Sequence, residues 1–166
     1  MRKLRPVRTM RYILIDKIEY LEYHRRLRAF KNVSSSEDYF RDHFIGQPVM
    51  PGALIIETFA QAGTALLEIS DDIRCKALLA MVERVKFRAL VRPGDRLAIE
   101  VSVVDRDGSW VRTTCTARVG DKVVAEGALT FSVQESESFY PRDLRAYVEM
   151  GYRQLLEGAT IEKGSS

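Results

Sequence analysis

Two side chains that can transfer protons lie on either side of a short turn in this chain. His43 comes first, Met50-Pro51-Gly52 follows, and Glu57 comes five residues after the glycine. A histidine side chain changes charge near neutral pH, so it can act as a base. A carboxyl group in apolar surroundings tends to keep its proton, so it can act as an acid. Such a pair can remove a proton next to a carbonyl group and expel a β-hydroxyl as water.

The turn between these two residues also offers donors for developing negative charge. A helix that begins at Pro51-Gly52-Ala53 has N–H groups without intrahelical partners at the positive end of its dipole. Gly52 has no side chain to hold a substrate away from that backbone. Gln61 comes four residues after Glu57, hence on the same helix face, where its amide can orient the carboxyl group. We therefore expect one site built from His43, Glu57, Gly52 and Gln61.

The elements that must position these residues form an α+β pattern. Residues 53–69 are apolar nearly all round, which predicts a buried helix. Alternating apolar residues predict strands over 11–20, 25–33, 97–103, 111–119 and 123–133. Turns are expected at Arg92-Pro93-Gly94-Asp95, Asp107-Gly108 and Gly120-Asp121. One buried helix among antiparallel strands predicts a sheet wrapped around that helix.

The chain is expected to divide into three parts. Residues 1–10 form a basic tail, residues 11–134 the main domain, and residues 135–166 a C-terminal extension. In the extension, apolar residues recur at helical spacing from Leu144 to Leu156, opposite charged residues. This spacing predicts an amphipathic helix that docks on its own subunit or on a neighbour. The last residues, 164–166, are expected to be disordered.

The residues from 42 to 61 resemble a family pattern. The 3-hydroxyacyl-(acyl carrier protein) dehydratases of the FabZ type carry roughly G-H-F-P-G-H-P-x-M-P-G-x-L-x-x-E-A-x-A-Q. This chain matches that pattern at His43-Phe44, Gly46, Pro48, Met50-Pro51-Gly52, Leu54, Glu57, Ala60 and Gln61. The resemblance implies a hotdog fold, with His43 and Glu57 as catalytic residues, the Gly52 N–H at the thioester carbonyl, and Gln61 beside the acid.

The same resemblance implies how the enzyme assembles and what it uses. It implies a cofactor-free and metal-free lyase whose substrates are carried by acyl carrier protein. It also implies a homodimer or a trimer of dimers, in which the histidine of one subunit meets the glutamate of the other. Basic residues at Arg84, Lys86, Arg88 and Arg92 are candidates to contact the acidic carrier protein.

Two departures from the family pattern leave other interpretations open. Ile45 stands where the family usually has proline, and Asp42 where it usually has glycine. A looser loop behind His43 is one expected consequence, since proline would fix φ there. The alternatives are a hotdog thioesterase, whose acidic residue directs water at the carbonyl, and a non-catalytic acyl-binding or assembly subunit.

Composition excludes several classes of protein. The net charge of +3 over 166 residues does not favour a nucleic-acid binder. No apolar run is expected to reach the roughly 18 to 20 residues that span a bilayer, so no membrane association is predicted. Cys75 and Cys115 lack metal-ligand or framework spacing. Reduced thiols in a cytoplasmic protein are therefore expected.

Overall fold

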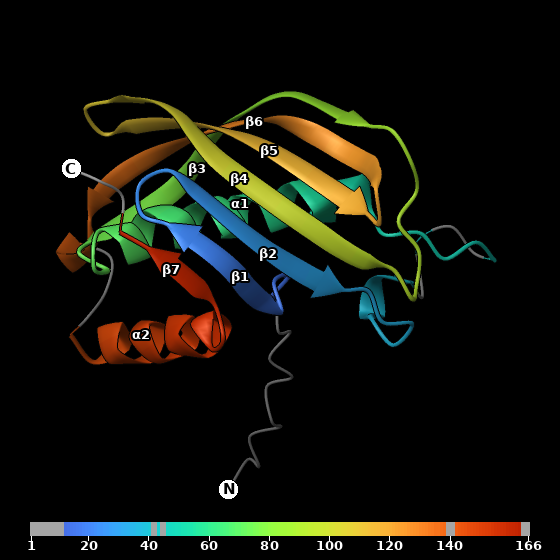
Figure 1. The fold of residues 1–166 in the computed structure, drawn as a ribbon, viewed down its shortest axis with the longest axis horizontal. Helices are drawn as coiled ribbons and strands as arrows, with labels where there is room; N and C mark the ends of the chain where they lie inside the picture. Colours follow the sequence, from blue (N-terminus) through green and yellow to red (C-terminus); the bar gives the residue numbers. More distant parts are fainter. Residues whose placement is uncertain (1–11, 41–42, 44–45, 139–141, 164–166) are drawn as a thin grey trace, which may run out of the picture.

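The computed structural model describes residues 12–40, 43, 46–138 and 142–163, which form a seven-stranded sheet around a long helix (Figure 1). The sheet order is β3-β6-β5-β4-β2-β1-β7, so β3 and β7 are its edges. Neighbouring strands are antiparallel except β1 and β7, which run parallel. The strands are β1 (Lys17–Glu22), β2 (Arg26–Asn32), β3 (Cys75–Phe87), β4 (Arg96–Asp107), β5 (Trp110–Val119), β6 (Lys122–Glu135) and β7 (Thr160–Glu162).

Helix α1 (Gly52–Ser70) is the core of the molecule, as its sequence predicts. It contacts β2, β3, β4, β5 and β6, and Phe59 and Leu66 on it are fully buried. A Cβ atom at Gly63 would lie 2.4 Å from the ring of Phe131, so glycine lets this ring pack directly on the helix. By length and composition alone α1 could cross a membrane, contrary to expectation, yet 61% of that apolar window is buried inside the protein. The helix is the centre of the fold.

Several strands differ from the sequence prediction. The first strand was expected over 11–20, but β1 begins only at Lys17. Before that point the backbone has other partners, since the Leu14 N–H donates to the Gln61 side chain at 2.8 Å. Strand β3 was missed because its apolar residues do not alternate with polar ones, and most residues after Leu78 are exposed. The three-residue β7 was missed because it is too short to show a pattern.

Helix α2 (Arg142–Leu156) and β7 form the C-terminal extension and pack on their own chain. β7 pairs with β1, and α2 contacts β1 (Figure 1). The hydroxyl of Tyr152 on α2 donates to Glu68 Oε2 at 2.8 Å. The side chain of Glu68 is fully buried, and its Oε1 lies 2.9 Å from Lys76 Nζ. Tyr152 thus ties the extension to a buried carboxylate in the middle of the fold.

Replacing Tyr152 with phenylalanine should lower the free energy of unfolding by about 1–3 kcal/mol, because a buried carboxylate loses a hydrogen-bond donor. Tyr147→Phe is the matched control, since Tyr147 is on the same helix and 68% exposed. Urea unfolding of both variants measures the difference. Equal stability of the two variants would show that α2 is not held in this way.

Both cysteines are buried free thiols. Burial is the main factor that raises the pKa of Cys75 to about 12, and it raises the pKa of Cys115 to about 12 as well. A thiol with such a pKa carries almost no thiolate at neutral pH, so neither side chain is suited to act as a nucleophile.

Two short 3-10 helices complete the described structure, at Asp38–Phe40 and Ser136–Ser138. The turn at 92–95 is present as expected: the Asp95 N–H donates to the Arg92 carbonyl at 3.1 Å, and Gly94 has a φ of +94°. The predicted disorder at 164–166 falls outside the described residues.

Candidate active site

Glu57 and Gln61 lie on one face of α1 and are joined by a hydrogen bond. Gln61 Nε2 donates to Glu57 Oε1 at 3.0 Å and to the Tyr12 carbonyl at 2.9 Å, while Gln61 Oε1 accepts the Leu14 N–H at 2.8 Å. Two backbone contacts therefore fix which end of the amide faces the acid, because the N–H of Leu14 can only donate and the carbonyl of Tyr12 can only accept. Glu57 Oε1 is thereby held as an acceptor, and Oε2 is the carboxyl oxygen that this amide does not contact.

His43 is oriented by the backbone that leads into α1. Its Nδ1 lies 3.0 Å from the Val49 carbonyl oxygen, and both Val49 and Met50 are buried. The Met50 N–H donates to the Val91 carbonyl at 2.8 Å, which ties this segment to the core. A carbonyl oxygen can only accept, so Nδ1 carries the hydrogen and the neutral ring keeps its basic lone pair on Nε2. This tautomer suits a general base.

Gly52 is the first residue of α1, at the end of the helix where N–H groups have no intrahelical acceptor. Pro51 precedes it without any side-chain cap, and the N–H groups of Leu54 and Ile55 turn back to the Pro51 carbonyl. The N–H groups of Gly52 and Ala53 are then the donors that the helix itself does not use. A Cβ atom at Gly52 would come within 2.9 Å of the Phe87 ring, so glycine lets this ring pack against the start of the helix.

A cavity of about 1080 Å³ lies beside α1, and Glu57 and Gln61 are on its wall. Its apolar lining comes from Tyr12, Ile13, Ile15, Ala60, Ala65, Ala77, Leu78, Leu79, Val148 and Leu155. Lys31 also lines it, with ion pairs to Asp16 and Glu37 at 3.2 and 2.7 Å. Burial favours the neutral amine, but these two carboxylates outweigh it and raise the pKa of Lys31. This lysine is therefore charged and already paired.

The structure brings together part of the predicted site. Of the four predicted residues, Glu57 and Gln61 line the cavity of their own chain, and His43 and Gly52 are not among the described residues of its wall. The expectations about Asp42 and Ile45 lie outside the described residues. Within the described part of the chain, no cluster of three or more His, Cys, Asp or Glu side chains is placed to hold a metal ion.

Sequence reasoning missed the groups that hold Gln61 and those that close the cavity. Tyr12 and Leu14 act through their backbone, about 50 residues before Gln61, so side-chain type gave no signal. The cavity is also lined by Val148, Gly151 and Tyr152 of α2. The only available signal was the apolar face of that helix.

A mostly antiparallel sheet wrapped around one long central helix is the arrangement of the hotdog fold. A hot-dog-like protein from Thermanaerovibrio acidaminovorans superposes with a TM-score of 0.60 at 21% identity, covering 79% of this chain and 94% of its own. The model of the FabA-like domain matches residues 6–128, and the chain belongs to this family.

Relatives within the family are dehydratases by name. The 3-hydroxyacyl-[acyl-carrier-protein] dehydratase FabZ of Clostridium kluyveri is 41% identical over 123 residues, 74% of this chain and 85% of that protein. The enzyme of the same name from Anaeromyxobacter dehalogenans is 40% identical over 130 residues, 76% of this chain and 83% of that protein.

Proposed function

We propose that this protein removes water from (3R)-hydroxyacyl thioesters to give trans-2-enoyl thioesters in fatty-acid biosynthesis or a related lipid pathway. The single observation that carries the proposal is the hydrogen bond that the Gln61 side chain donates to one carboxyl oxygen of Glu57. Gln61 is itself held by hydrogen bonds to the backbone of Tyr12 and Leu14. This arrangement suits an acid held in place on the wall of a cavity. Identity of about 40% to FabZ dehydratases supports the same reaction.

In the first half of the reaction, His43 acts as the base. Its Nε2 takes the α-proton, and the electron pair of the broken C–H bond moves to the thioester carbonyl oxygen. The N–H of Gly52 donates to that oxygen, and a donor already in place stabilises the charge without reorganisation. The hydrogen bond from Nδ1 to the Val49 carbonyl at 3.0 Å holds the ring in the tautomer that this step needs.

In the second half, Glu57 acts as the acid. The enolate pair returns to form the double bond between C2 and C3, and the C3–O bond breaks. Oε2 of Glu57 gives its proton to the departing hydroxyl, which leaves as water, while Oε1 remains bonded to Gln61. The enzyme ends with a protonated His43 and an ionised Glu57, so a proton must return from one to the other, directly or through solvent, before the next turnover.

The proposed active form is a homodimer, or a trimer of dimers, in which the β3 edges of two copies pair. β3 has 13 residues at the sheet edge, with Leu79, Met81 and Val82 between 39% and 54% exposed. An exposed apolar edge of that length favours strand pairing. Leu78 and Leu79 of the same strand line the cavity that holds Glu57, so a second copy on β3 could bring its own His43 to that cavity.

The proposed substrates are bound to acyl carrier protein, which is acidic, and the proposed location is the cytoplasm. Lys86 and Arg92 are exposed near the end of β3 that reaches Phe87, beside Gly52. We expect Lys86→Glu with Arg92→Glu to raise KM for carrier-bound substrate about tenfold or more and to leave KM for the CoA thioester unchanged. Steady-state kinetics with both substrates measures this, and equal changes for both would contradict carrier docking at this place.

The proposal is tested by following both possible products of a 3-hydroxyacyl thioester. A dehydratase forms the enoyl thioester, seen as absorbance of the conjugated band, with no release of thiol. A thioesterase releases free thiol, seen with a thiol reagent, with no conjugated product. Thiol release alone would overturn the proposal, and absence of both products with carrier-bound and CoA substrates would favour a non-catalytic acyl-binding subunit.

A further inference from the structure

The C-terminal extension forms one wall of the cavity that holds Glu57. The lining residues of α2 include Val148, Gly151, Tyr152 and Leu155, which recur at i, i+3, i+4 and i+7 and therefore share one face of the helix. Ala65 of α1 and Leu78 of β3 line the same cavity. The family match covers residues 6–128, so α2 lies outside the matched residues.

The extension is fixed to the rest of the chain by contacts along its length. Near its beginning, Arg145 donates to the Asp72 carbonyl at 3.1 Å. In its middle, Tyr152 donates to the buried Glu68 at 2.8 Å. Near its end, Lys17 pairs with Glu157 at 3.0 Å. Because these contacts hold α2 near its start, in its middle and just after its end, the helix is a fixed boundary of the cavity.

We propose that α2 sets the length of the acyl chain that this enzyme accepts, with Gly151 at the position where the chain ends. The inference rests on the proposed dehydratase function, since it places the reacting carbons at Glu57. From Glu57 to Ala65 the cavity follows α1 for eight residues, about 12 Å at 1.5 Å per residue. An extended chain advances about 1.25 Å per carbon, so on the order of ten carbons fit along this path.

Gly151 is a suitable place to shorten the cavity. A Cβ atom there would meet nothing within 4 Å, so a side chain enters empty space on the face that lines the cavity. Replacing a helical glycine also favours the helix, so Gly151→Phe and Gly151→Leu should fold. Met150→Phe is the matched control, because Met150 is the adjacent residue, is 51% exposed and is not among the lining residues.

The test compares kcat/KM for trans-2-decenoyl-CoA and trans-2-butenoyl-CoA in the hydration direction. The native protein should prefer the longer chain. Burial of one methylene is worth about 0.8 kcal/mol, or roughly fourfold, so loss of three buried methylenes in Gly151→Phe should lower the ratio of long to short about 60-fold. Gly151→Leu should lower the ratio less, and Met150→Phe should keep the native ratio. A native ratio in Gly151→Phe, or a native protein that does not prefer the longer chain, would overturn the inference.

A binding measurement separates this inference from the dehydratase proposal. Decanoyl-CoA and butanoyl-CoA have neither a β-hydroxyl nor a conjugated double bond, so a dehydratase cannot convert them. Calorimetry therefore reports their affinities, with a thiol reagent to check that neither thioester is hydrolysed. If the native protein turns over neither enoyl thioester, the proposed function fails. The inference then still stands if Gly151→Phe lowers the affinity for decanoyl-CoA about 60-fold and Met150→Phe leaves that affinity unchanged. Equal binding of decanoyl-CoA by all three proteins would overturn it.

Discussion

Replacing His43 with alanine is expected to lower kcat for dehydration by about 10²–10⁴-fold, the usual range for loss of a general base. The base reaches the substrate through Nε2, because Nδ1 is occupied by the Val49 carbonyl at 3.0 Å. Glu57→Gln should cause a loss of similar size, because glutamine keeps an acceptor for Gln61 but has no acidic proton to transfer to the leaving hydroxyl. Enoyl formation from a 3-hydroxyacyl thioester measures both variants.

The second histidine of the chain supplies the control for this result. His24 is exposed in the β1–β2 turn with a φ of +60°, a conformation that asparagine tolerates. His24→Asn should therefore keep native kcat. The double variant of His43 and Glu57 should be little worse than either single variant, because residues that act as one unit are not additive. Independent, multiplying losses would contradict a shared active site.

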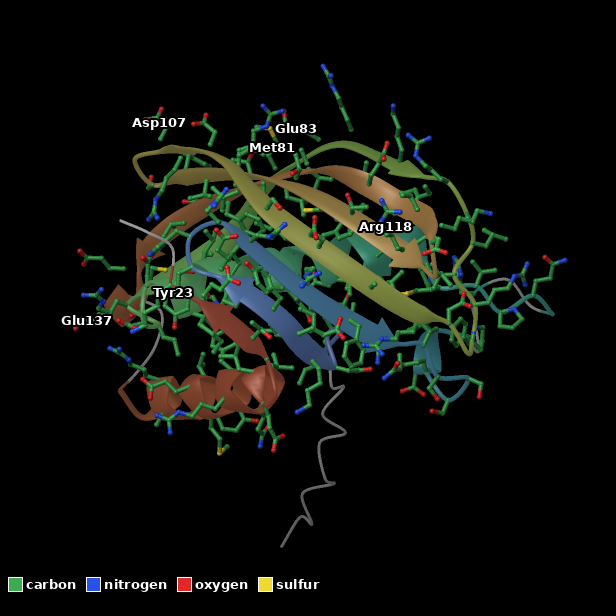
Figure 2. The ribbon with its side chains drawn as sticks, in the orientation of Figure 1. Tyr23, Met81, Glu83, Asp107, Arg118 and Glu137 are labelled. Atoms are coloured by element: carbon green, nitrogen blue, oxygen red, sulfur yellow. The ribbon has the colours of Figure 1, made fainter. Side chains whose placement is uncertain are left out.

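Replacing Met81 with aspartate is expected to split the proposed dimer and to reduce activity at least 100-fold. Met81 lies on the exposed β3 edge, 54% accessible, and Figure 2 shows it near Glu83 in the upper part of the view. A buried, unpaired charge in a strand-pairing interface costs several kcal/mol. If His43 and Glu57 of one site come from two subunits, the monomer has no complete site.

Light scattering on a sizing column and the enoyl assay together measure the effect of Met81→Asp. Val104→Asp is the control, because Val104 is 53% exposed but lies on β4, in the interior of the sheet order. That variant should remain dimeric and active. A fully active Met81→Asp monomer would show that each chain carries a complete site, and a Met81→Asp dimer would place the interface elsewhere.

The parts of the fold and site that follow from the sequence are those set by local spacing. The buried helix was predicted over 53–69 and lies at Gly52–Ser70. A helix that is apolar on nearly all faces is stable only in the interior of the protein. The contact of Gln61 with Glu57 at 3.0 Å follows from their i, i+4 spacing. Strands β4, β5 and β6 were predicted because each alternates and is bounded by turn residues.

The parts that could not be predicted depend on distant or missing partners. β3 exposes Leu79, Met81 and Val82, so its apolar residues do not alternate with polar ones and no period of two marks the strand. Tyr12 and Leu14 hold Gln61 by backbone atoms, which carry no residue-type signal. The role of α2 as a cavity wall depends on where residues 142–156 pack on the rest of the chain. Helical periodicity identifies the apolar face of this helix but not the element that the face contacts.

The most direct test of the account uses dimers assembled from two different subunits, purified through two affinity tags. One dimer joins a His43→Ala subunit to a Glu57→Gln subunit, and the other joins a native subunit to the double variant. If His43 and Glu57 form one site across the β3 interface, the first dimer has one intact site and about half of native activity, and the second has almost none. Activity in the second dimer alone would place both residues in one chain, and an inactive first dimer would contradict the site proposed here.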